Sequence, residues 1–75
     1  MIQGSVWKHT KTRGYYAVVV LAIREADGEA MVVYRSLDDN RVWVRPLAEW
    51  HQVVPVDETG RCAPRFQMVG EAEKL

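Results

Sequence analysis

The sequence predicts an all-β fold, a small five-stranded barrel with one short helical turn. Twelve valines, three tyrosines and three tryptophans among 75 residues belong to the types enriched in strands. Turn signals rich in Asp, Asn and Gly separate the apolar segments. A chain this short holds a single core. We therefore expect one domain over residues 1–69 and a polar, frayed tail over residues 70–75.

The first three strands are expected at residues 4–9, 15–23 and 30–35. Residues 15–23 are apolar on both faces, which predicts a central or wrapped strand. A basic loop over residues 10–14 precedes it. Asp27-Gly28 supplies the positive φ of a two-residue hairpin, so a tight turn is expected between the second and third strands.

A fourth strand is expected at residues 41–45, after an Asp-Asp-Asn turn. Its alternation places Val42 and Val44 on one face. The opposite face receives Arg41, Trp43 and Arg45.

Pro46 ends that strand and presets φ for a helical turn over residues 46–51, with Leu47 and Trp50 on one side. Residues 52–56 then form a strand, which Pro55 restricts to a sheet edge. A turn at 57–60 precedes a final strand at 65–69. The first five of these strands, with one helical turn before the fifth, match the order of a small SH3-like barrel.

Charge and composition limit the partners. The formal net charge is zero, which argues against general polyanion binding. That zero combines a basic block, with four cations and no acid in residues 1–24, and an acidic block, with five acids against Arg35 in residues 25–40. No apolar run approaches the roughly 18 residues of a membrane helix, and no signal peptide is visible. The single cysteine, Cys62, fits a reducing compartment, so a cytoplasmic protein without membrane contact is expected.

Catalysis and metal binding have little support. Cys62 with His9 or His51 would be a nucleophile and base, but nothing nearby resembles a nucleophile elbow or an orienting acid. Two histidines and one cysteine give no ligand cluster at a recognised spacing. Since there is also no glycine-rich phosphate loop, we expect no enzyme activity, metal or cofactor.

Arginines interleaved with aromatic residues are the main candidate site. A guanidinium binds carboxylates or phosphates through two parallel hydrogen bonds and stacks on rings. Arg45 and Arg65 would hold an anionic group while Trp43 stacks on a flat one. The expected ligand-binding residues are Tyr34, Arg35, Trp43, Arg45, Arg65 and Phe66.

A structural interpretation competes with this site. In it, Trp43 covers an open barrel end, and Arg41 and Arg45 pair with Asp38, Asp39 or Glu49. The loop over residues 8–13 is a second contact surface, in which His9 titrates near neutrality if exposed. Alternatively, this loop is solvated and balances the acidic block. Tyr15 and Tyr16 are expected in the core and its rim.

Several motifs resemble one known family. They are Gly4-x-Val6-Trp7-Lys8-His9, Ala22-x-Arg24, Val32-Val33-Tyr34-Arg35, Val42-Trp43-Val44-Arg45-Pro46-Leu47 and Pro64-Arg65-Phe66. These motifs resemble the bacterial domain-of-unknown-function family 1653 (DUF1653), and the similarity spans about residues 4–69. This chain departs from its pattern at residues 24–27, where members tend to have His-Ser-Glu-Thr, and at residues 49–50, where they tend to have Met-Phe. The resemblance implies a compact domain and supplies no function.

The expected function is a non-enzymatic binding module for an anionic or flat ligand. A nucleotide, a short single-stranded nucleic acid or an acidic peptide or protein partner would satisfy the arginines and the ring. The alternative is an interaction or assembly module, in which the strand at residues 52–56 and an exposed Trp7 or Trp50 pair with another chain.

Overall fold

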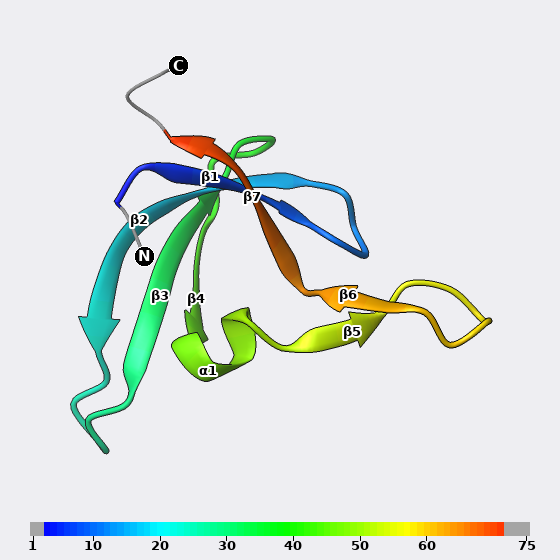
Figure 1. Cartoon of the computed structure of the whole chain (residues 1–75). Helices are drawn as coiled ribbons and strands as arrows, with labels where there is room; N and C mark the ends of the chain where they lie inside the picture. The colour runs from blue at the N-terminus through cyan, green and yellow to red at the C-terminus, as the bar shows by residue number, and fades with distance from the viewer. Residues whose placement is uncertain (1–2, 72–75) are drawn as a thin grey trace.

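The computed structural model describes residues 3–71, which form seven strands and one helical turn (Figure 1). The elements are β1 (Ser5–His9), β2 (Tyr15–Ile23), β3 (Ala30–Ser36), β4 (Val42–Pro46), α1 (Leu47–Trp50), β5 (Val53–Pro55), β6 (Cys62–Pro64) and β7 (Phe66–Glu71). The predicted all-β class is confirmed. The first four strands and the helical turn lie within one or two residues of their expected bounds.

The strands form two antiparallel sheets. Five strands pair in the order β4-β3-β2-β1-β7, and β5 pairs with β6 in a separate ribbon. Figure 1 shows this ribbon extending to one side of the larger sheet. The edge strands β4 and β7 pair only with β3 and β1, so within residues 3–71 the sheet is not a closed barrel. The reason is that the chain between these edges forms α1 and the ribbon rather than a bridging strand.

The hairpin between β2 and β3 is wider than predicted. Ile23 pairs with Ala30, so the connecting loop spans residues 24–29 rather than two residues. The guanidinium of Arg24 donates to Asp27 and Glu29, with its shortest contacts at 2.7 and 2.9 Å. Gly28 has φ of 74°, the left-handed conformation that glycine adopts without steric cost. These contacts within the loop stabilise its wider form.

The C-terminal boundary also differs from the prediction. Gly70 pairs with Val6, and Glu71 pairs with Ser5, so both residues belong to β7. The part of the predicted tail at residues 70–71 is therefore strand. The remainder, residues 72–75, lies outside the described residues.

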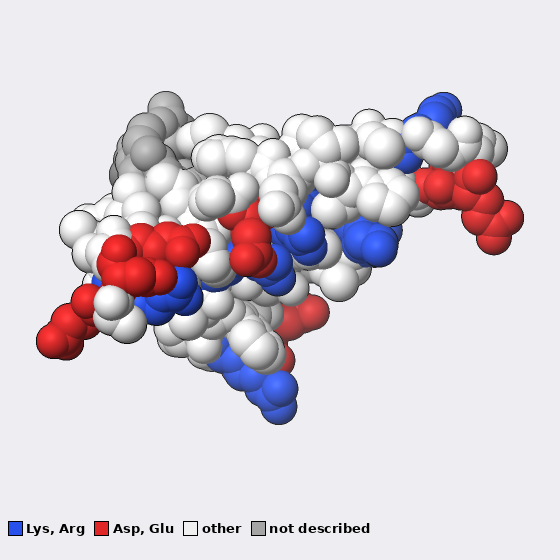
Figure 2. Space-filling model, turned by 90° about the horizontal axis from the view of Figure 1, so that it is seen from below, with Lys and Arg blue, Asp and Glu red and all other residues white. Residues whose placement is uncertain are grey.

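Among the described ion pairs, the two charge blocks meet only at Arg24, the last cation of the basic block. Asp27 and Glu29 pair with Arg24, and Asp39 pairs with Arg41 at 3.6 Å. None of these carboxylates neutralises the basic loop between β1 and β2. In Figure 2, basic side chains gather near the centre of the face beside an acidic group, while the larger acidic groups lie toward its two ends. Basic side chains also lie beside the acidic groups at both ends of this face (Figure 2).

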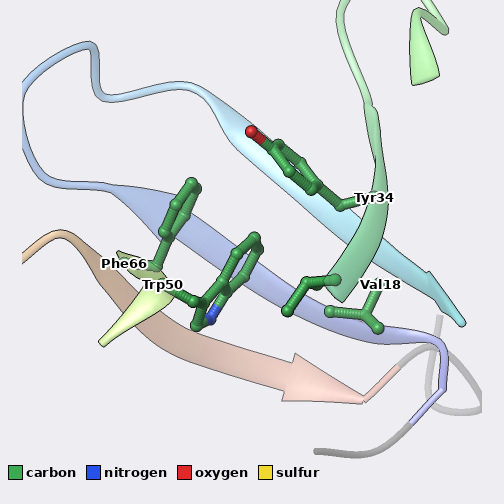
Figure 3. Close-up of a cluster of buried hydrophobic side chains, with 5 residues drawn as sticks. Val18, Tyr34, Trp50 and Phe66 are labelled. Carbon is green, nitrogen blue, oxygen red and sulfur yellow. The ribbon is translucent and has the colours of Figure 1, made fainter. Parts of the chain in front are cut away.

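Aromatic rings fill the core. The fully or almost fully buried cluster is Val18, Val32, Tyr34, Trp50 and Phe66. Figure 3 shows the Trp50 and Phe66 rings face to face, and their centroids are 3.7 Å apart. Trp7 is half-buried and meets Trp50 edge-on at 5.6 Å. The alternative expectation of an exposed Trp50 is therefore wrong, because α1 packs this ring into the core.

Candidate functional site

Four of the six predicted ligand-binding residues line one hollow of about 200 Å³. Its lining residues are His9, Thr12, Tyr16, Tyr34, Trp43, Arg45 and Phe66. Tyr34 and Trp43 are directly paired residues of β3 and β4, so their side chains share a face. Arg45 lies two residues beyond Trp43 on the same face. Tyr34 and Phe66 are buried, whereas Trp43 is 47% exposed. The hollow thus has an aromatic floor and an accessible indole wall.

The structure does not bring Arg35 into this hollow. Arg35 follows Tyr34 on β3, and consecutive strand residues point to opposite faces. Its guanidinium Nη1 donates to Asn40 Oδ1 at 2.8 Å. The Arg35 side chain therefore lies on the opposite face of the sheet.

Arg65 lies close to the hollow without lining it. Its backbone N–H donates to the Gln52 carbonyl at 2.7 Å, and its Nη2 donates to Gln52 Oε1 at 3.3 Å. The positive charge of Arg65 nevertheless contributes to lowering the pKa of His9. Arg65 therefore adds positive potential beside the hollow.

Arg45 has one weak partner and spare donors. Its Nη1 lies 3.5 Å from Glu49 Oε1, and its side chain is 27% exposed. Arg41 likewise pairs with Asp39, so both ion pairs of the competing structural interpretation are present. However, the buried Nε atoms of Arg45 and Arg65 have no hydrogen-bond partner among residues 3–71. The unsatisfied Nε of Arg45 costs about 1–3 kcal/mol. Because this atom is closed to solvent, an acceptor in the hollow would meet the partly exposed end of the guanidinium instead.

His9 is a buried, neutral wall of the hollow. Its Nδ1 accepts hydrogen bonds from the backbone N–H groups of Lys11 and Thr12, both at 3.2 Å. Burial lowers the pKa of His9 below 6.5, and the charges of Arg45, Arg65 and Lys11 lower it further. Because an accepting Nδ1 carries no proton, the neutral ring carries its proton on Nε2. The sequence predicted titration of His9 near neutrality only if this side chain were exposed, and it is buried.

Sequence reasoning did not assign His9, Thr12 or Tyr16 to this hollow. The sequence did indicate that His9 faces inward, because the two-residue alternation of β1 places it on the same face as the half-buried Trp7. Thr12 reaches the hollow because its loop folds back onto His9, to which the Thr12 N–H donates a hydrogen bond. Tyr16 was expected in the core or its rim, where its ring meets Tyr34 at 5.5 Å and Phe66 at 5.8 Å.

A second hollow of about 250 Å³ shares His9 with the first. It is lined by Lys8, His9, Thr10, Arg13, Val56, Ala63 and Gln67. These residues come from β1, the loop that follows it, the end of the β5–β6 ribbon and β7. The second hollow therefore combines two cations with polar and small apolar side chains.

Cys62, the candidate nucleophile of the sequence, lines neither hollow. Cys62 lies exposed on β6, and its Sγ donates to the Gly60 carbonyl at 3.5 Å. Among the side chains of residues 3–70, no three His, Cys, Asp or Glu are grouped to hold a metal ion. The same part of the chain has no helix long and apolar enough to cross a membrane.

Comparisons with known proteins identify one family. A family described as "Protein of unknown function (DUF1653)" matches residues 5–68. A crystal structure of a DUF1653 protein from Bordetella bronchiseptica is similar, with 27% sequence identity and a TM-score of 0.77. That similarity covers 93% of this chain and 90% of the solved one. A search of curated proteins found no match.

Proposed function

The chain belongs to the DUF1653 family, whose function is unknown, and we propose that it is a non-enzymatic binding module for a flat, anionic ligand. One observation carries the proposal: the half-exposed ring of Trp43 and the guanidinium of Arg45, whose contact with Glu49 is 3.5 Å long, face the same hollow. A nucleotide, a short single-stranded nucleic acid or an acidic peptide has the matching chemistry.

The proposed site divides the ligand between two kinds of contact. The exposed face of Trp43 stacks on a flat group, which contributes about 1–3 kcal/mol for a nucleic-acid base. Arg45 binds the anionic group through charge-assisted hydrogen bonds, worth about 1.5–3 kcal/mol each. His9 offers a neutral N–H donor from Nε2, and Arg65 strengthens the positive field nearby.

The rigidity of the hollow supports this division. Tyr34 and Phe66 lie in the buried aromatic core, and Tyr34 meets Trp50 edge-on at 4.9 Å. Trp43 pairs with Tyr34 across β3 and β4, so its backbone is fixed by the sheet. A preorganised site loses little conformational entropy when a ligand binds.

Calorimetric titration with nucleoside monophosphates and with an acidic peptide tests the proposal. Arg45→Ala is expected to weaken binding by at least tenfold, because it removes the charged donors. Arg35→Ala is the matched control, since it removes the same side chain from the opposite face. Trp43→Ala is compared in the same way with Val44→Ala. No heat at millimolar ligand, or equal losses in Arg45→Ala and Arg35→Ala, contradicts the proposed site.

A second candidate function is assembly with another chain. It is favoured by β4, an edge strand whose Val42 and Val44 are 61% and 60% exposed. An exposed apolar edge strand is a template for strand pairing. Sedimentation at varied concentration separates the two candidates. Assembly requires a concentration-dependent dimer that Val44→Lys abolishes, whereas a ligand-binding monomer shows neither effect.

We extend the proposal to the finer architecture and the location. The order β4-β3-β2-β1-β7, with α1 before the last strands, supports an SH3-like arrangement. The exposed free thiol of Cys62 supports a bacterial cytoplasmic protein, where thiols stay reduced.

A further inference from the structure

The two hollows share a wall and are held in a fixed relation. His9 lines both of them, and the loop between β1 and β2 contributes Thr12 to the first and Thr10 and Arg13 to the second. A ligand longer than one unit, bound between Trp43 and Arg45, therefore meets the second hollow on passing His9.

Hydrogen bonds attach this loop to the rest of the fold. The Thr10 N–H donates to the Arg65 carbonyl at 2.8 Å, and its hydroxyl donates to the Pro64 carbonyl. Gln67 Nε2 donates to Thr10 Oγ1 at 3.3 Å. Because His9 also accepts two bonds from the loop, the wall between the hollows is part of the folded structure.

The second hollow carries uncompensated positive charge. Lys8, Lys11 and Arg13 form no ion pair with any carboxylate of residues 3–70, whereas Arg24 forms two and Arg41 and Arg61 form one each. The Lys8 ammonium lies 5.6 Å from the Tyr15 ring centroid, a contact that positions this charge without neutralising it. Unpaired cations around a concave surface attract a chain of regularly spaced anions.

We propose that one short single strand of nucleic acid occupies both hollows. A base stacks on Trp43, its phosphate binds Arg45, and the neighbouring phosphates bind Lys8 and Arg13. This assignment rests on the proposed function and specifies its ligand and a second subsite.

The pairing of a ring with separate cations favours a nucleic acid over an acidic peptide. A nucleic-acid strand carries one flat base and one negative charge in every unit, which matches Trp43 beside Arg45, Lys8 and Arg13. An acidic peptide supplies a ring for Trp43 only where an aromatic residue happens to lie beside its carboxylates, whereas every nucleotide of a strand carries both groups. Without such a ring, the ligand contacts Arg45 but makes no stacking contact with Trp43.

Titration with thymidylates of one and four nucleotides tests the second subsite. The wild-type protein is expected to bind the tetranucleotide at least tenfold tighter than the mononucleotide. Each phosphate contact on a single strand contributes a slope of about 0.7 to the dependence of log affinity on log salt. Two such contacts make the affinity of the wild-type protein for the tetranucleotide fall by about sevenfold when the salt concentration rises fourfold. The variant in which Gln replaces both Lys8 and Arg13 lacks these contacts, so it should not show this part of the salt dependence.

Controls separate this inference from the proposed function. The Lys8→Gln and Arg13→Gln double variant should bind the mononucleotide like the wild type, whereas Trp43→Ala weakens both ligands. The Arg35→Ala and Arg41→Ala double variant removes two charges that line neither hollow, and it should retain the wild-type salt dependence.

Three outcomes overturn the inference. Equal affinity for one and four nucleotides eliminates the second subsite while leaving the Trp43–Arg45 site intact. Hexaglutamate binding as tightly as the tetranucleotide indicates a peptide ligand instead. Failure of both thymidylates to bind removes the proposed nucleotide site together with the inference.

Discussion

Neutralising Glu49 should strengthen anion binding, because this carboxylate competes with the ligand for Arg45. The Arg45–Glu49 contact is 3.5 Å long, and the Glu49 side chain is 47% exposed. An exposed pair four residues apart contributes only about 0.3–0.5 kcal/mol. An anion at a similar distance on another edge of the guanidinium lies roughly 7 Å from the carboxylate, where two like charges in water repel by about 0.6 kcal/mol.

Glu49→Gln removes both effects, which together amount to about 1 kcal/mol and so to about fivefold tighter binding. The assay is calorimetric titration with a nucleoside monophosphate at low salt, beside urea unfolding to show that stability falls by at most about 0.5 kcal/mol. Glu25→Gln is the matched control, since Glu25 is exposed in the β2–β3 loop. Unchanged or weaker binding by Glu49→Gln, or an equal gain in Glu25→Gln, refutes the competition.

Three further predictions concern stability, each measured by urea unfolding. The folded-state pKa of His9 lies below its unfolded value of about 6.5. Neutral His9 therefore contributes to the free energy of unfolding above that pH, and this contribution is lost as the pH falls below it. When the pH falls from 7 to 5, His9→Asn should therefore lose less stability than the wild type. Asp27, whose pKa is about 2, stays ionised over this range and does not contribute to the difference. The same dependence of stability on pH in both proteins contradicts this prediction. Trp50→Ala should cost about 3–5 kcal/mol, because the ring is fully buried, and a loss below about 1 kcal/mol would show that the core collapses around the gap. Gly28→Ala should cost about 1–2 kcal/mol at φ of 74°, whereas Gly70→Ala, with open space around it, should be near neutral; equal effects exclude backbone strain as the cause.

Local patterns predicted the main sheet well. The nine-residue apolar run at Tyr15–Ile23 is β2, and Pro46 starts the helical turn that carries Trp50. Strand alternation also placed Trp43 and Arg45 on one face, which is how both reach the hollow.

The remaining features depend on contacts between distant segments. The short strand β6 was missed because Cys62–Pro64 lacks apolar alternation and pairs only with β5, so its formation depends on the ribbon. Barrel closure was overestimated because the strand count does not show which edges meet. The position of Arg35 outside the hollow was predictable, because Arg35 adjoins Tyr34 and adjacent strand residues face opposite ways.

Chemical-shift mapping of the Trp43 indole N–H and the Arg45 Nε–H during nucleotide titration tests the central claim most directly. Binding in the hollow predicts that both signals move saturably with one dissociation constant, together with backbone signals at His9. The Arg35 Nε–H, on the opposite face, should stay in place. Shifts confined to Arg35 and its neighbours, or no shifts at millimolar nucleotide, would contradict the claim that Trp43 and Arg45 form one binding site.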